Sequence, residues 1–152
     1  MNSKGASQDA SIQDASIQDA SIVIINYNSL RFLDELFASI QDQPLAPREI
    51  FLVDNASSDR SVEVARELCP ELKIIKFEEN LGFAAAANAG LEASSCEATA
   101  ILNTDIKLEN CWLEELLKSL SSGTDVAAVA SKVMLYEKPG YINGVGGAMN
   151  RL

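Results

Sequence analysis

The chain has 152 residues, enough for one domain with a substantial core. Hydrophobic residues make up 47% of it, so the composition is that of a folded protein rather than a disordered one. The formal net charge of −10 argues against nucleic acid or an anionic membrane surface as the main partner. The chain has no histidine, which excludes the Ser-His-Asp and Cys-His nucleophile systems and any His-ligated metal site.

The cysteines and the hydropathy pattern indicate the compartment. Cys69, Cys96 and Cys111 are scattered and form no CxxC pair, as expected of small buried side chains in a reducing cytoplasm. No apolar run approaches the ~18 residues of a transmembrane helix, and the N-terminal region lacks the apolar segment of a secretory signal. We therefore expect a cytoplasmic protein without a transmembrane segment, with peripheral association at the inner face of the membrane as an alternative.

A tandem repeat of the sequence ASIQD, first in the shorter form ASQD, occupies residues 6–22. A period of five matches neither a helix nor a strand, and so few units cannot form a solenoid. The repeat predicts a disordered, solvated tail over residues 1–20, with a tail that recruits a partner as the alternative. One domain is then expected over residues 21–152.

From residue 21 the chain alternates strand-like and helix-like segments. Continuous apolar runs predict buried strands, and apolar stripes at three- and four-residue spacing predict helices, with Asp59 and Asn110 as helix caps. The expected strands are 22–25, 50–53, 72–77, 98–102 and 126–130, and the expected helices lie within 30–40, 59–68, 82–93 and 110–120. This alternation predicts an α/β fold, in which a mostly parallel sheet is covered by helices on both faces.

Polar segments follow three of these strands, at 26–28, 54–59 and 103–105. Parallel strands point the same way, so the three segments are expected to meet at one edge of the sheet, where ligands of such folds bind. Asn103 and Asp105 fall on the same side, two residues apart. A carboxylate with a polar neighbour there suits a divalent cation that carries a diphosphate. The alternative for each segment is a simple turn or a helix cap.

The helix expected over 82–93 is rich in small residues. A ligand or a neighbouring backbone can therefore approach it closely. Gly82 lies near its start, where free N–H groups favour an anion or a nucleotide ribose. The alternative is a helix whose small residues pack tightly on the sheet, although Asn88 is harder to assign to packing.

Four segments together resemble the family 2 glycosyltransferases with the GT-A fold, a Rossmann-like architecture, and especially their rhamnosyltransferase-like branch. The resemblance implies transfer of a sugar, with inversion, from a nucleotide diphosphate-sugar to the hydroxyl of a saccharide or lipid-linked acceptor, in the synthesis of cell-surface polysaccharide or glycan. The matching segments are SIVIINYN (21–28), VDNASSDRS (53–61), NLGFA (80–84) with Asn88, and LNTD (102–105).

The resemblance also implies roles for single residues. Asp105 would be the ligand of Mg²⁺ or Mn²⁺, which binds through few carboxylates plus substrate phosphates and stabilises charge on the leaving nucleoside diphosphate. Asp54 would contact the base or ribose. The nucleotide-sugar-binding residues implied in this way are Tyr27, Asn28, Asp54, Asn55, Gly82, Asn88, Asn103 and Asp105.

The sequence departs from the family pattern at three places. Asn103 replaces the first acid of the DXD segment, and Arg60 stands where glycine is usual. Relatives continue beyond a Gly-rich stretch like 143–147 into an acceptor half that carries the general base. We therefore expect a C-terminally truncated, donor-binding part with no matched base, whose exposed edges at 126–130 and 133–135 promote self-association.

Two alternative functions remain open at this stage. One is an inactive remnant that at most binds nucleotide. The other is a nucleotidyltransferase, which would usually show a Gly-rich loop with Arg or Lys after the first strand, unlike the segment 26–29.

Overall fold

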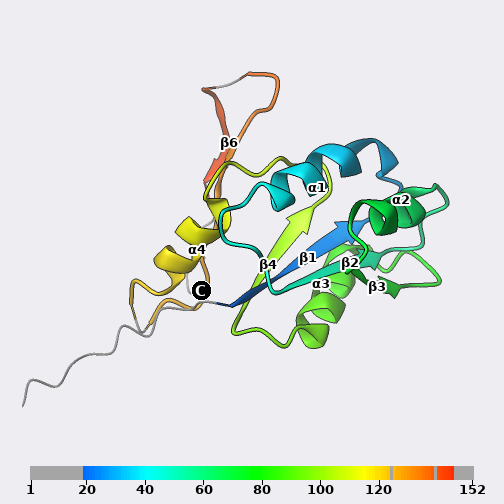
Figure 1. Cartoon of the computed structure of the whole chain (residues 1–152), viewed down its shortest axis with the longest axis horizontal. Coiled ribbons are helices and arrows are strands. Elements are labelled where there is room, and N and C mark those ends of the chain that lie inside the picture. The colour runs from blue at the N-terminus through cyan, green and yellow to red at the C-terminus, as the bar shows by residue number, and fades with distance from the viewer. Residues whose placement is uncertain (1–18, 124, 139, 146–152) are drawn as a thin grey trace, which may run out of the picture.

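The computed structural model describes residues 19–123, 125–138 and 140–145 (Figure 1). The predicted tail over 1–20 lies outside this range except for Asp19 and Ala20. Among the described residues, no helix is both long and apolar enough to cross a membrane. The elements are β1 (Ala20–Asn26), η1 (Leu30–Phe32), α1 (Leu33–Gln41), β2 (Glu49–Asp54), α2 (Ser61–Leu68), β3 (Lys73–Lys76), α3 (Gly82–Ala93), β4 (Ala98–Asn103), α4 (Trp112–Leu120), β5 (Lys132–Met134) and β6 (Ile142–Val145).

The centre of the fold is a four-stranded parallel sheet with the order β3-β2-β1-β4. This arrangement confirms the predicted α/β fold with a mostly parallel sheet. Asn26 pairs in register with Asp54, and Ile25 pairs with Asn103. The polar segments that follow β1, β2 and β4 therefore begin at the same edge of the sheet.

Helices cover both faces of the sheet, as predicted (Figure 1). Ile22 and Ile24 of β1 pack in the cluster that contains the apolar residues of α1 and α2. Val23 and Ile25 point the other way and pack against α3, because successive side chains of a strand face opposite sides. This alternation explains why β1 is apolar throughout.

The small residues of α3 serve close packing on the sheet. Ala86, Ala87 and Gly90 are buried, and a Cβ added at Gly90 would lie 2.2 Å from Cγ1 of Val23. The alternative of tight packing is thus confirmed for this face of α3. Asn88 lies on α3 with its side chain exposed.

The predicted strand over 126–130 is wrong, because this segment has an irregular conformation. Alanine is depleted in strands and offers little apolar area to bury. An apolar run that consists largely of alanine therefore does not join the sheet. The chain instead forms a separate antiparallel pair of β5 and β6. Exposed apolar side chains are found on β5, β6 and the segment between them, namely Val133, Met134, Leu135, Tyr136, Tyr141 and Ile142.

The two predicted helix caps, Asp59 and Asn110, each lie one residue before the observed N-cap. Asp59 is not the N-cap of α2, since that position belongs to Arg60, although the Asp59 carboxylate accepts the N–H of Ser61, the first residue of α2, at 3.0 Å. Asn110 is not the N-cap of α4. That position belongs to Cys111, whose φ of +60° is left-handed, and the Asn110 side chain accepts the Cys111 N–H instead.

Glu49, at the opposite end of β2 from the polar segments, gives a pH-dependent contribution to stability. Its carboxylate accepts hydrogen bonds from Lys73 Nζ at 2.6 Å and from the N–H of Ser95 at 3.0 Å. The bond with Lys73 is the main reason why the pKa of Glu49 falls to about 2. A carboxyl with a lowered folded-state pKa stabilises the fold above its ordinary pKa, and this contribution disappears as the pH falls through the folded value.

We therefore expect Glu49→Gln to lower the urea midpoint at pH 7, with a deficit that shrinks as the pH falls from 5 toward 2. Urea unfolding at several pH values checks this. Glu97→Gln, at an exposed glutamate near the same end of the sheet, is the matched control. A Glu49→Gln deficit that stays constant with pH would contradict the prediction.

Candidate functional site

The candidate site is a pocket at the carboxyl ends of β1 and β4. The strand order reverses there, because the chain runs from β1 outward to β3 and then returns to β4 on the other side of β1. In open α/β sheets this reversal opens the crevice in which ligands bind. The cavity measures about 490 Å³, a size typical of small-molecule sites. It is lined by Ile25, Tyr27, Asn28, Ser29, Arg31, Phe32, Asn55, Asn80, Phe83, Asn103, Thr104 and Asp105.

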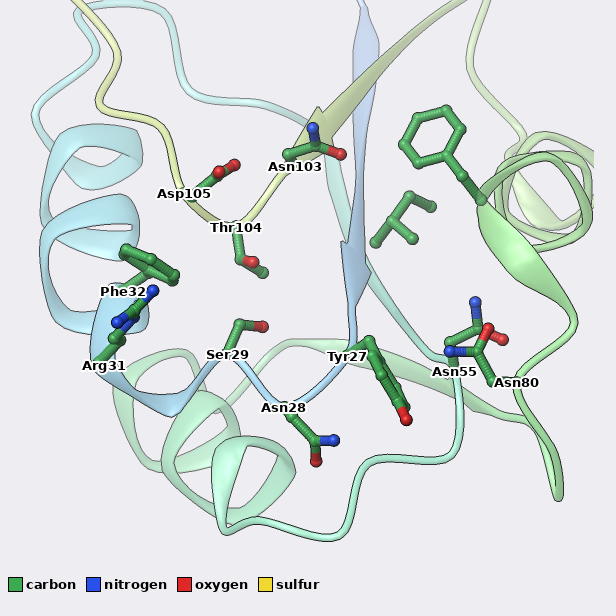
Figure 2. A pocket seen from close by; sticks show the side chains of 12 residues that line it. Tyr27, Asn28, Ser29, Arg31, Phe32, Asn55, Asn80, Asn103, Thr104 and Asp105 are labelled. Atoms are coloured by element: carbon green, nitrogen blue, oxygen red, sulfur yellow. The ribbon is translucent and has the colours of Figure 1, made fainter.

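The pocket has two chemically different ends. Figure 2 shows Asn55 and Asn80 on one side, with Arg31, Phe32 and Asp105 on the opposite side. One end thus offers amide groups, which can donate and accept hydrogen bonds. The other end carries both formal charges of the lining. Such a pocket suits an elongated ligand with a neutral polar head and a charged tail.

A buried hydrogen-bond network fixes the β1 and β2 ends beneath the pocket. Asn26 is fully buried, and its Nδ2 donates to Asp54 Oδ1 at 2.8 Å and to Ser61 Oγ at 2.8 Å. Nδ2 also lies 3.1 Å from Ser57 Oγ, and Asn26 Oδ1 accepts from Ser29 Oγ. We call these five residues the Asn26 network. It sets where the lining segment 27–29 leaves β1.

Asn28 ties the loop after β1 to the loop after β2. Its φ of +50° is left-handed, a conformation that asparagine tolerates better than most residues. Its Oδ1 accepts the N–H of Ser58 at 2.8 Å, and its own N–H donates to Ser57 Oγ at 3.0 Å. The two loops therefore form one rigid wall of the pocket.

Asparagine side chains also organise the start of α3. Asn55 Oδ1 accepts the N–H of Leu81 at 2.8 Å, and Asn80 Oδ1 accepts the N–H of Gly82 at 2.9 Å. Gly82 has a φ of +83°, which favours glycine. The N–H of Gly82 is thus already taken, so the expectation that it stands free for an anion is not met.

The structure brings together five of the eight predicted donor-binding residues. Tyr27, Asn28, Asn55, Asn103 and Asp105 all line the pocket. Asp54, Gly82 and Asn88 do not. The Asp54 carboxylate is buried in the Asn26 network, Gly82 shapes the turn into α3, and Asn88 is exposed on that helix.

Sequence reasoning assigned no role to several other lining residues. Arg31 and Phe32 fell inside a predicted continuous helix over 30–40, but the short turn η1 precedes α1 and both residues line the pocket. Phe83, in the first turn of α3, lines it as well. In the sequence, only their position could have indicated that Arg31, Phe32 and Phe83 line the pocket, since each lies within a few residues of a polar segment.

The donor set at Asp105 can be tested against the metal that the family resemblance implies. Within the described parts of the chain, no three His, Cys, Asp or Glu side chains gather as a metal cage. Asp105 supplies the single carboxylate of the pocket lining, two residues after the Asn103 amide. This set fits Mg²⁺ or Mn²⁺ that takes its remaining ligands from phosphate oxygens and water. It does not fit a cation held by protein alone.

The parallel sheet and the pocket at its carboxyl edge define an α/β domain with a small-molecule type of site, and comparison with known proteins gives the family. The family model described as Glycosyl transferase family 2 matches residues 21–143, so the chain belongs to this family. The uncharacterized glycosyltransferase YwdF of Bacillus subtilis is 36% identical over 121 residues, which cover 78% of this chain and 44% of YwdF. The chain spans less than half the length of the curated relatives it matches.

Solved structures show the same fold. The mannosyltransferase PcManGT from Pyrobaculum calidifontis, in complex with GDP-Man and Mn²⁺, aligns with a TM-score of 0.65 at 23% identity, covering 80% of this chain and 37% of PcManGT. S. aureus TarS 1–349 in complex with UDP-GlcNAc aligns with a TM-score of 0.62 at 22% identity, covering 68% and 31%. These likenesses confirm the predicted GT-A fold. The rhamnosyltransferase-like branch stays a prediction.

Proposed function

We propose that this chain binds a nucleotide diphosphate-sugar in the pocket between the β1 and β4 ends. The protein would transfer that sugar, with inversion, to an acceptor hydroxyl. The observation that carries the proposal is the two-ended pocket at the point where the strand order reverses, in a chain of glycosyltransferase family 2. Support comes from structural neighbours that hold UDP-GlcNAc, or GDP-Man with Mn²⁺.

The lining residues divide into two proposed groups. Tyr27 and Asn28 contact the nucleoside together with Asn55, which lies at the amide end of the pocket. Asn103 and Asp105 contact the diphosphate end, where Asp105 also holds Mg²⁺ or Mn²⁺. The cation, when bound, neutralises charge on the diphosphate.

The three predicted residues outside the pocket lining receive different proposed roles. Asp54 positions the β1 end through its bond to Asn26 rather than touching the base or ribose. Gly82 acts through the backbone turn that begins α3. A contact from Asn88 would require a ligand that extends beyond the pocket lining.

Donor binding without transfer is a second candidate for this chain. Asp105 is the only carboxylate among the described residues that line the pocket, and the proposal assigns it to the metal. An inverting transfer also needs a base beside the acceptor hydroxyl.

For the whole protein we propose a saccharide or lipid-linked acceptor in cell-surface polysaccharide or glycan synthesis. We also propose a cytoplasmic location, because the three cysteines are scattered in the sequence and form no CxxC pair.

Titration with UDP, GDP and dTDP, with and without Mn²⁺, tests the proposal. We expect at least one nucleotide to bind more tightly with Mn²⁺, because Asp105 and the diphosphate share the cation. Asp105→Asn should remove most of that metal dependence while leaving the fold intact. Asp34→Asn, at an exposed acid on α1, is the matched control.

Two outcomes would count against the proposal. Nucleotide binding that does not depend on Mn²⁺ would contradict the role of the metal. Equal affinities of Asp105→Asn and the unchanged chain in the presence of Mn²⁺ would contradict the role of Asp105. Release of nucleoside diphosphate from a bound donor, measured with candidate acceptors, separates transfer from binding alone.

A further inference from the structure

The charged end of the pocket contains a cation without a charge partner. Arg31 is the only lysine or arginine among the described residues that line the pocket. Its guanidinium carbon lies 4.4 Å from the centroid of the Phe32 ring. Within residues 19–123, 125–138 and 140–145, no carboxylate forms an ion pair with it. Arg31 thus lies in the pocket without an ion-pair partner, in a chain with a net charge of −10. This arrangement indicates that the pocket binds an anionic ligand.

The contact with Phe32 leaves the N–H donors of the Arg31 guanidinium available for a ligand. An aromatic ring covers one face of the planar group, while the N–H donors lie in its plane and remain free to bind. Those donors match two oxygens of one phosphate group, which an ammonium group cannot do. Ordering by the ring also reduces the conformational freedom that Arg31 would lose on binding.

The position of Arg31 selects which part of a nucleotide it can reach. Figure 2 places Arg31 and Asp105 on the side of the pocket away from Asn55 and Asn80. A nucleoside held at the amide end would direct its phosphates toward Arg31 and Asp105. The phosphate farthest from the nucleoside would then lie nearest to the charged residues.

We propose that Arg31 is a substrate-binding residue that holds the terminal phosphate of the nucleoside diphosphate. This inference rests on the proposed function and adds a protein cation to the metal ion that Asp105 would hold. A phosphate on an acceptor is the other source of the same chemistry. It predicts a different result, because Arg31 would then not affect the affinity for free nucleoside diphosphate.

The experiment compares dissociation constants for a nucleoside diphosphate and its monophosphate in the presence of Mn²⁺. The nucleotide is whichever of UDP, GDP and dTDP binds most tightly. Arg31→Gln should weaken diphosphate binding about tenfold or more and monophosphate binding much less. Arg31→Lys should fall between, because it keeps the charge but loses the fork of donors. Arg60→Gln, at an exposed arginine outside the pocket lining, should change neither constant.

The possible failures can be told apart. Equal weakening of both nucleotides by Arg31→Gln, or no weakening, overturns this inference and leaves the proposed function standing. Absence of nucleotide binding by the unchanged chain overturns both. Urea unfolding of each variant shows whether a loss of affinity has a structural cause, and Arg31→Lys keeps the inference testable if Arg31→Gln folds poorly.

Discussion

Asn26→Ala is expected to lower the free energy of unfolding by about 3–5 kcal/mol. Asn26 is fully buried, and its amide serves Asp54, Ser61 and Ser29. Alanine would leave Oδ1 of Asp54 without its donor in the interior, since only 3% of the Asp54 surface is exposed and the remaining donor, the N–H of Ser57 at 3.3 Å, reaches Oδ2. A buried polar group that loses its partner costs about 1–3 kcal/mol, and a charged one costs more.

Urea unfolding measures this effect, and nucleotide titration measures its consequence for the pocket. We expect weaker nucleotide binding as well, because the Asn26 network positions the segment 27–29 that lines the pocket. Asn88→Ala is the matched control at an exposed asparagine and should change stability by less than about 0.5 kcal/mol. An Asn26→Ala variant as stable as the unchanged chain would show that the network is dispensable.

Gly90→Ala is expected to destabilise the fold by about 1–3 kcal/mol, even though alanine is the better helix former. The added Cβ would lie 2.2 Å from Cγ1 and 2.9 Å from Cγ2 of Val23. The valine cannot easily move aside, because its branched side chain is stiff and fully buried. Helix α3 would have to shift away from β1.

A double-mutant cycle with Val23→Ala checks the cause. Removing the valine methyl groups makes room for the new Cβ, so Gly90→Ala should cost much less in the Val23→Ala background. Gly82→Ala is the contrasting control. Its φ of +83° imposes backbone strain of about 1–2 kcal/mol, but no atom lies within 4 Å of the added Cβ. Val23→Ala should therefore leave the cost at Gly82 unchanged, and an unchanged cost at Gly90 would contradict the collision.

The order of strands and helices up to β4 could be predicted because hydrophobic periodicity is a local property. The helix over 82–93 was predicted with its observed bounds, and the strand ends met at one edge as expected. The error at 126–130 arose because an apolar run does not reveal which partner it can pair with. Asn26 was placed in a polar segment at the ligand-binding edge, with a turn or cap as the alternative, because neither its burial nor its bonds to residues 28 and 35 positions away can be recognised in the sequence.

The sequence predicted which segments form the candidate site better than it predicted which of their side chains face the pocket. The family resemblance implied that Tyr27, Asn28, Asn55, Asn103 and Asp105 bind the donor, and all five line the pocket. The direction of each side chain was not available from the sequence. Asp54 was therefore expected to contact the ligand, as Asp105 was, although Asp54 is buried and Asp105 is exposed. Arg31 was missed because a turn replaced the first part of a predicted helix.

The reversal of strand order has a consequence for how the domain folds. The two pocket walls come from β1 and β4, whose paired residues are separated by 78 positions, as between Ala20 and Ala98. Closing so long a loop is slow, because chain entropy is lost before the contacts at the ends of the loop form and stabilise the structure. Pairing of β1 with β2 needs a much shorter closure. The pocket should consequently be among the last parts of the domain to form. A ligand that contacts both walls would hold β1 and β4 together once the domain has folded.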